Sequence, residues 1–404
     1  MESIAASLLT PDIEAGELPP VLRPIAEATL PNGAAGRALF FGHLSRRADR
    51  DDNTRLAERF LDRAMGVVAR VPMRPALLGG FGGIGWVAEH LGKFCLEREG
   101  DDPLASLDGA IGRRLRHPMA PLDYDLVSGI AGFGIIALER FPRPSAVRCL
   151  ELVLTRLFER AEQTNGVARW LTRPEHLPPR DRRAFPNGYY VLGLAHGIAA
   201  VVVVMAGAVA RGTGGARVRE LLDESVRFLL SVDQRDDPLP YWTGPGVPLS
   251  RGRSAWCHGD PGIGVALLAA ARAVAEPEWE REARRILLRA ARRPPGESGA
   301  VEAGLCHGTA GLAHIFRRSH EATLEPELRT ASTYWFERTL ELLDEDLEGA
   351  GTGGASSIRS GFLTGKAGIG LALLSALEPL EPAWDSVLGI SLPHYASGAL
   401  PVSA

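Results

Sequence analysis

Residues 259–268 read Gly-Asp-Pro-Gly-Ile-Gly-Val-Ala-Leu-Leu, and this pattern of small residues organises the whole chain. Anchored on its second glycine, the pattern occurs seven times, at intervals of 47 to 65 residues. The seven anchors are Gly36, Gly83, Gly132, Gly197, Gly262, Gly311 and Gly368. Three residues before the anchor, every repeat has glycine except the fourth, which has Leu194. Repeats of this length are typical of arrays in which each unit buries one face on its neighbours.

The runs that follow the anchors predict helices rather than dinucleotide-binding loops. Such a loop needs a preceding strand, and no β-rich run precedes these glycines. Small residues in the first turn allow close backbone approach, so apolar runs such as 368–377 predict inner, buried helices. More polar amphipathic runs lie between them and predict outer helices, for example at residues 53–70, 145–163, 218–232 and 325–344. The sequence thus predicts an all-α fold, and closure into an α/α toroid would leave no exposed end.

Composition narrows the class of protein. The chain has 404 residues, 45% of them hydrophobic, a formal net charge of −4 and arginines scattered in pairs, which gives no case for nucleic-acid binding. Four cysteines are too few for a disulfide framework, and the N-terminus lacks a secretory signal, so we expect a cytoplasmic protein. No low-complexity boundary divides the chain, and we expect one domain over residues 1–404. Two Pro/Arg-rich stretches, 172–187 and 234–253, predict long ordered loops.

The stretch 191–210 is as long as a bilayer span and has one polar side chain, His196. It falls at the inner-helix position of the fourth repeat. We therefore expect a buried helix here and no membrane span.

Two successive repeats carry the same exception to the pattern. Five residues before the anchor, Cys257 and Cys306 replace the aliphatic residues or proline of the other repeats, and each is followed by a histidine, His258 or His307. Equal register in adjacent repeats should bring the two pairs together at one mouth of the array. Thiolates and imidazoles suit tetrahedral zinc, and three ligands rather than four would leave an open, catalytic position. Cys95 and Cys149 have no such companions and are expected to be small buried residues.

Three further residues belong to segments that enter this mouth. His196 stands one residue before its anchor, where the other repeats have alanine, glycine or proline, and could transfer protons there. Asp125 and Arg253 lie seven and nine residues before their anchors. From spacing alone, a loop salt bridge or a helix cap explains these two equally well.

These motifs give the chain a resemblance to a known family. The strings Trp-Cys-His-Gly-Asp-Pro-Gly from Trp256, Leu-Cys-His-Gly-Thr-Ala-Gly from Leu305 and Gly-Leu-Ala-His-Gly-Ile-Ala from Gly193 resemble the signature of the LanC lanthionine synthetase cyclases. With Tyr-Asp-Leu-Val-Ser-Gly from Tyr124, the likeness covers essentially the whole chain.

The resemblance implies an α/α toroid with inner and outer rings of seven helices. It also implies one zinc ion per chain, held by Cys257, Cys306 and His307, with water or a substrate thiol in the fourth position. The family's proposed catalytic histidine and aspartate match His196 and Asp125, and its characteristic arginine matches Arg253. Many bacterial members have tyrosine where this chain has His258, as the eukaryotic LanC-like proteins do. We place His258 among the catalytic candidates and outside the zinc ligands.

The implied activity is zinc-dependent closure of (methyl)lanthionine thioether rings in lanthipeptide biosynthesis. The implied partners are a dehydrated precursor peptide with its leader and a dehydratase in a biosynthetic complex. The alternative is a LanC-like zinc protein that binds glutathione or other thiols without forming rings. A prenyltransferase-like barrel is expected to contain more aromatic residues than the 6% of this chain. A glycosidase-like barrel needs two acidic residues and no zinc.

Overall fold

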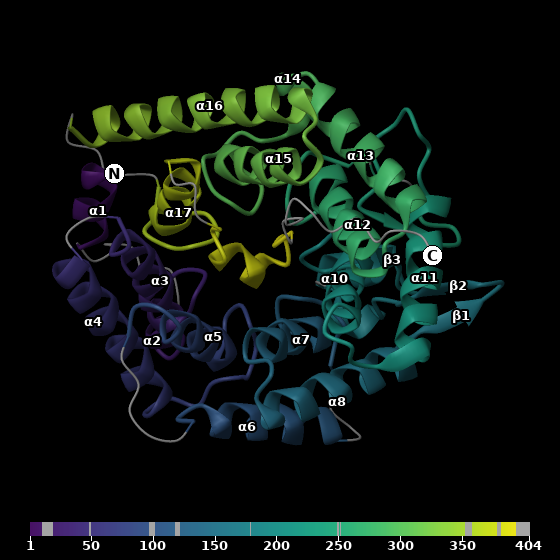
Figure 1. Ribbon diagram of the computed structural model, residues 1–404, viewed down its shortest axis with the longest axis horizontal. Coiled ribbons are helices and arrows are strands. Elements are labelled where there is room, and N and C mark those ends of the chain that lie inside the picture. The colour runs from purple at the N-terminus through teal and green to yellow at the C-terminus, as the bar shows by residue number, and fades with distance from the viewer. Residues whose placement is uncertain are drawn as a thin grey trace, which may run out of the picture.

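One helix from each repeat stands in a closed inner ring (Figure 1). The computed structural model describes residues 1–9, 19–47, 50–96, 102–117, 122–177, 179–248, 250, 252–351, 358–377 and 381–392. In chain order the inner helices are α3 (Ala34–Leu44), α5 (Phe81–Leu91), α7 (Ile130–Glu139), α10 (Ile198–Val209), α12 (Asp260–Val274), α15 (Thr309–Thr323) and α17 (Lys366–Leu377). Each packs on the next, and α17 packs on α3, so the ring is closed.

Amphipathic helices, most of them longer than the inner helices, surround this ring. They are α4 (Arg50–Val68), α6 (Ala105–Arg116), α8 (Pro144–Arg160), α11 (Gly215–Ser231), α13 (Pro277–Arg292) and α16 (Pro326–Gly351). In the seventh repeat the short N-terminal helix α1 (Glu2–Leu8) packs on α17, so the start of the chain completes its last repeat. Another short helix, α2 (Arg23–Ala28), packs on α3 and α4. The predicted all-α, α/α-toroid fold is confirmed.

Close contacts explain why small residues occur at each anchor and two positions after it. A Cβ atom on Gly262 would lie 2.2 Å from the carbonyl oxygen of Trp256, and all seven anchors have the corresponding contact, six residues back, within 2.6 Å. A side chain here would push the preceding loop away from the helix. Two residues later, a Cβ on Gly264 would lie 2.7 Å from Cγ of Leu287 on the outer helix α13. The anchor therefore shapes the loop, and the small residue after it admits the outer helix.

The long connections before α10 and α12 were expected to be loops, but they contain short strands and helices. A hairpin of β1 (Glu162–Thr164) and β2 (Val167–Arg169) turns at Asn165 and Gly166, which both have positive φ. The helix predicted over 145–163 therefore ends at Arg160, as α8. Further along, η2 (Pro174–His176) and α9 (Pro179–Ala184) precede β3 (Tyr190–Val191), which pairs antiparallel with β4 (Trp242–Thr243). This pairing ties the two long connections together.

The apolar stretch at 191–210 is only partly helical, because α10 begins at Ile198 and ends at Val209. Among the helices of the described residues, none has both the length and the apolar character that crossing a membrane requires.

Two short elements complete the described chain. Helix α14 (Pro295–Ser298) lies in the loop before α15, and η3 (Trp384–Leu388) lies near the middle of the inner ring (Figure 1).

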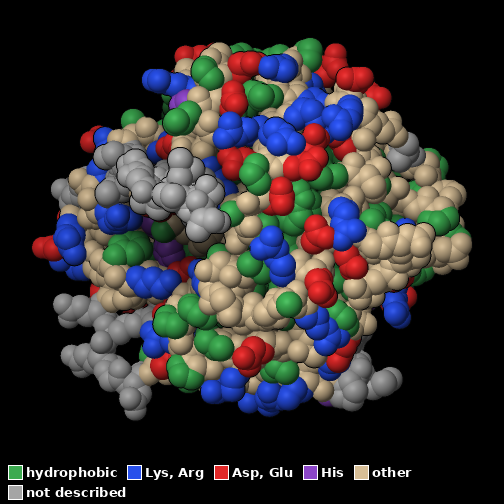
Figure 2. Space-filling view, turned by 45° about the vertical axis from the view of Figure 1, so that its right-hand side comes forward, with side chains coloured by type: hydrophobic (Ala, Val, Ile, Leu, Met, Phe, Trp, Pro, Cys, Tyr) green, Lys and Arg blue, Asp and Glu red, His purple; other side chains and the backbone are tan. Residues whose placement is uncertain are grey.

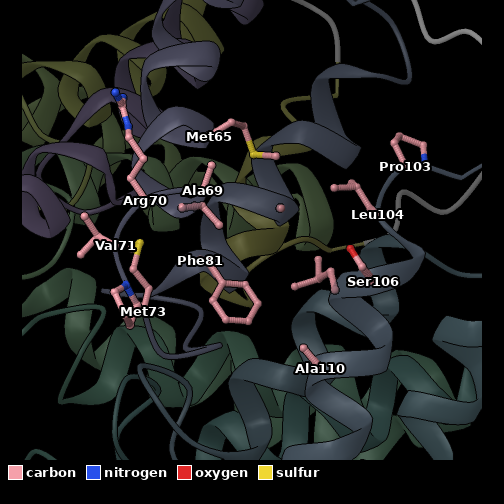
Figure 3. Close-up of a pocket in the computed structure, with 14 residues that line it drawn as sticks. Met65, Ala69, Arg70, Val71, Met73, Phe81, Pro103, Leu104, Ser106 and Ala110 are labelled. Atoms are coloured by element: carbon pink, nitrogen blue, oxygen red, sulfur yellow. The ribbon is translucent and has the colours of Figure 1, made fainter.

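The outer surface carries charged side chains and is hollowed between two of the outer helices. On the face shown in Figure 2, acidic and basic side chains are interspersed over most of the surface. A pocket of about 510 Å³ opens between α4 and α6, where Phe81 of the inner helix α5 lies among Met65, Met73 and Leu104 (Figure 3). The cysteine and histidine pairs do not line this pocket.

Candidate functional site

The loops that precede the inner helices meet at one end of the ring, and backbone hydrogen bonds join them. The residues five positions before the anchors supply most of these bonds, so that Cys257 N–H donates to the carbonyl oxygen of Cys306 over 3.2 Å. Further contacts include those of Leu78 to Val127 (2.8 Å), Leu126 to Ala195 (3.0 Å), Ala195 to Cys257 (3.2 Å), Cys306 to Leu363 (2.9 Å) and Leu363 to Pro31 (3.3 Å). Equal register therefore places the two Cys-His loops side by side.

Cys257, Cys306 and His307 form a group that could hold a metal ion. One ligand atom from each residue lies within 4.8 Å of the other two. Cys257 is buried, whereas Cys306 and His307 are half-buried, so the group is reachable from the mouth. Two sulfur atoms and one imidazole nitrogen are a donor set for a tetrahedral ion with its fourth position open.

The orientation of His307 fits this role. Its Nε2 lies 2.6 Å from Oε1 of Glu302. Its Nδ1 is buried and has no hydrogen-bond partner. A buried nitrogen without a partner is costly, and a bound ion would satisfy it.

The two thiols are electrostatically different. A hydrogen bond from Cys306, together with the interaction with His307 and the positive charge of Arg253, outweighs burial and lowers the pKa of Cys257 well below its usual range. The same hydrogen bond, together with burial, raises the pKa of Cys306. Arg253 donates from its guanidinium to Sγ of Cys257 over 3.5 Å. A lowered thiol pKa favours the thiolate, which is the form of cysteine that binds a metal ion.

His196 and Asp125 form a pair in the same mouth. Nδ1 of His196 lies 2.8 Å from Oδ2 of Asp125, whose other oxygen accepts the backbone N–H of Ser128 over 2.9 Å. The side chain of His196 is 49% exposed, whereas that of Asp125 is 6% exposed. Desolvation lowers the pKa of His196, but the hydrogen bond and charge of Asp125 outweigh it, and the pKa is raised. The imidazole is therefore oriented by a fixed carboxylate and open to the mouth.

His258 contacts the imidazole of His196 and is not one of the three potential metal ligands. Its ring is stacked on that of His196, with centroids 5.8 Å apart. Its Nδ1 is buried without a hydrogen-bond partner, and burial lowers its pKa to about 4. His258 is therefore a neutral imidazole at physiological pH.

Two side chains at the site were not predicted from the sequence. Tyr241, from the connection before α12, packs edge-on against His258 at 5.5 Å between ring centroids. It lies outside the repeat register, so no sequence signal marked it. Glu302 lies nine residues before its anchor, the position that Arg253 holds in the previous repeat. Extending the register comparison to that position would have found it.

The other two cysteines do not join the metal-binding group. Cys149 is buried and its thiol donates to the carbonyl oxygen of Asp108 over 3.1 Å. Cys95 is half-buried beside Ser45, with 3.6 Å between Sγ and Oγ. Both lie in contacts that explain them without a ligand.

Comparison with known proteins identifies the family of this chain. The model of lanthionine synthetase C-like proteins matches residues 24–389. The nisin biosynthesis protein NisC of Lactococcus lactis subsp. lactis is 23% identical over 319 residues, which are 72% of this chain and 73% of that protein. The solved structure of nisin cyclase has the same fold, with a TM-score of 0.77, 19% identity and 96% of each chain covered. Because the family match spans nearly the whole described chain, this protein belongs to the lanthionine synthetase C-like family.

Proposed function

We propose that this protein is a zinc-dependent lanthipeptide cyclase. The observation that carries the proposal is the convergence of Cys257, Cys306 and His307 in the same mouth as the His196–Asp125 pair. Two sulfur ligands and one imidazole suit zinc better than hard cations such as magnesium, which prefer oxygen. The similarity to NisC and nisin cyclase supports the same conclusion.

In the proposed reaction, a cysteine of the substrate peptide adds to a dehydroalanine or dehydrobutyrine residue. The S–H bond adds across the C=C bond, so sulfur bonds to the β-carbon and the α-carbon receives a proton. Bound zinc would lower the pKa of the substrate thiol and so supply a thiolate at neutral pH.

The chain's own residues handle the proton and the developing charge. Because Asp125 accepts from Nδ1 of His196, Nε2 is the nitrogen that can take up the thiol proton or deliver one to the α-carbon. Arg253 also has a buried Nε without a hydrogen-bond partner, and its guanidinium can stabilise the negative oxygen of the enolate. His258 and its neighbour Tyr241 would border the substrate.

The proposal also covers the substrate peptide, the partner enzyme, the domain organisation and the cellular compartment. The substrate is a precursor peptide whose serines and threonines another enzyme, a dehydratase, has dehydrated, and its leader remains attached during cyclisation. The closed ring of seven repeats supports a single domain over residues 1–404. We place the reaction in the cytoplasm.

Two measurements test the proposal. Elemental analysis of the purified protein should find one zinc per chain, and Cys257→Ala or Cys306→Ala should empty the site while circular dichroism stays unchanged. The second measurement follows the loss of alkylatable thiols from a dehydrated precursor peptide, with spontaneous cyclisation subtracted. Stoichiometric zinc in both variants would refute the metal site. A zinc-loaded protein that accelerates no ring formation on its own peptide would instead indicate a thiol-binding protein.

A further inference from the structure

Glu302 occupies a fixed position at the base of the loop that carries Cys306 and His307. Its carbonyl oxygen accepts the N–H of Thr309, the first residue of α15, over 2.8 Å. Gly308 packs on the same carbonyl, because a Cβ there would lie only 2.3 Å from it. The backbone of Glu302 is therefore set by the start of the inner helix, and its side chain lies beside the imidazole of His307.

The same backbone position recurs around the ring. Nine residues before the anchor, the carbonyl oxygen accepts an N–H from the first residue of the inner helix in four repeats. These bonds run from Phe81 to Arg74 (2.9 Å), Ile130 to Asp123 (2.9 Å), Thr309 to Glu302 (2.8 Å) and Lys366 to Arg359 (2.7 Å). Arg253 holds this position in the fifth repeat and contacts Cys257, while Glu302 holds it in the sixth and contacts His307. Two equivalent positions thus each contact one member of the metal-binding group.

The contact between Glu302 and His307 selects one form of the imidazole. In a neutral imidazole one nitrogen carries the proton and the other carries the lone pair that binds a metal. With Nε2 held 2.6 Å from a carboxylate oxygen, the proton belongs on Nε2. The lone pair is then left on Nδ1, the buried nitrogen without a partner.

We propose that Glu302 is a positioning residue that holds the Nε2–H of His307 and so presents Nδ1, together with the sulfurs of Cys257 and Cys306, to the metal ion. This inference rests on the metal centre of the proposed function and adds a residue that governs its affinity. Carboxylates that accept the second N–H of a metal-bound histidine typically change metal affinity by about 10- to 100-fold.

Two substitutions at Glu302 test the hydrogen bond and the negative charge of its side chain separately. Glu302→Ala removes the acceptor and should weaken zinc binding about 10- to 100-fold, measured by competition with a chromophoric chelator. Glu302→Gln keeps an oxygen that can accept the N–H but removes the charge, so its affinity should lie between those of Glu302→Ala and the unmodified protein. Glu297→Gln, at an exposed glutamate earlier in the same connection, is the matched control and should retain full affinity. Thermal unfolding of each variant identifies any general loss of structure.

The possible results lead to different conclusions. Unchanged zinc affinity in Glu302→Ala would overturn the positioning role alone and leave the metal centre standing. If Glu297→Gln weakened binding as much as Glu302→Ala, the effect would be that of surface charge, and the positioning role would also fall. If the unmodified protein bound no zinc at Cys257, Cys306 and His307, both this inference and the proposed function would fail. Weakened binding in Glu302→Ala without any ring formation by the zinc-loaded unmodified protein would support the inference and refute only the cyclase activity.

Discussion

The fold orients the imidazole of His196 for the proposed proton transfer. Its imidazole projects into the mouth from the residue before Gly197, which caps the first turn of α10. The hydrogen bond to Asp125 fixes its orientation, and Asp125 is itself fixed by the N–H of Ser128. A histidine that is oriented by these hydrogen bonds can transfer protons without being a metal ligand.

We expect His196→Ala to bind zinc and dehydrated peptide normally but to form rings about 10² to 10⁴ times more slowly. That loss is usual when a general acid or base is removed. The measurement is the rate at which alkylatable thiols disappear, compared at equal zinc content. A rate equal to that of the unmodified protein would assign His196 a purely structural role.

His258 provides the contrasting prediction. It follows Cys257 in sequence, yet it lies outside the group of three potential ligands. His258→Ala should therefore retain stoichiometric zinc, whereas His307→Ala should lose it. Turnover by His258→Ala should fall, because the variant loses the ring that stacks on His196. Equal zinc loss in the two variants would indicate a closed, four-ligand site.

Among the elements, α12 and α13 hold the loop of Cys257 through one buried carboxylate. Asp260, the first residue of α12, is fully buried and accepts the N–H of Leu239 over 2.8 Å. Both of its oxygens accept from Arg289 at 3.0 Å, and Arg293 donates to Asp260 and to Ser254, each at 3.0 Å. One ion-pair cluster thus ties the outer helix α13 to both sides of the site loop.

Arg289→Leu should destabilise the protein by on the order of 3 kcal/mol, because it leaves the buried carboxylate of Asp260 with one cation fewer. The measurement is the free energy of unfolding from denaturant titration. Arg292→Leu is the matched control on the same helix, since Arg292 is 62% exposed and pairs with Glu327 at the surface. Its effect should be much smaller. Similar losses for the two variants would contradict a special role for the buried cluster.

On the scale of the whole molecule, both ends of the described chain help to close the toroid. At the start, α1 packs on α17, and near the end, η3 enters the middle of the ring (Figure 1). Asp385 in η3 is fully buried, 2.9 Å from Nε of Arg318 and 3.1 Å from Nε2 of His314, both on α15. Leu388 accepts the indole N–H of Trp256 over 2.8 Å, so this segment reaches the residue before Cys257.

The ion pairs of Asp385 predict a pH dependence of stability. Burial raises its pKa, but the charge of Arg318 and the hydrogen bond from His314 outweigh it, so the pKa is lowered. A lowered carboxyl pKa contributes stability that is complete above the unfolded-state value, about 3.9, and is lost as the pH falls through the folded-state value. Asp385→Asn should therefore reduce the free energy of unfolding fully at pH 7 and by less once the pH is below about 4.

The control for this prediction is the same substitution at Asp344, which is exposed on α16. It should leave the unfolding free energy unchanged at both pH values. A deficit in Asp385→Asn that stays constant from pH 7 into the acid range would contradict the assigned ion pairs.

The ring and the meeting of the two Cys-His loops could both be predicted from the repeat pattern of the sequence. Both follow from backbone geometry that every repeat shares, because an anchor glycine admits the carbonyl six residues earlier and so forces each loop into the same shape. Residues at the same register therefore occupy equivalent positions in successive repeats. A backbone hydrogen bond joins Cys257 to Cys306 for this reason.

The side chains that surround these loops could not be predicted from the repeat pattern, because they come from segments that pack together only in the folded protein. Tyr241 reaches His258 from a connection outside the repeat, and η3 reaches Trp256 from more than a hundred residues further along the chain. Glu302 stands at a repeated backbone position, yet its contact with His307 in the same loop depends on the orientation of a half-exposed side chain. Periodic backbone contacts are local and leave a pattern in the sequence, whereas contacts between distant segments depend on packing that no spacing records.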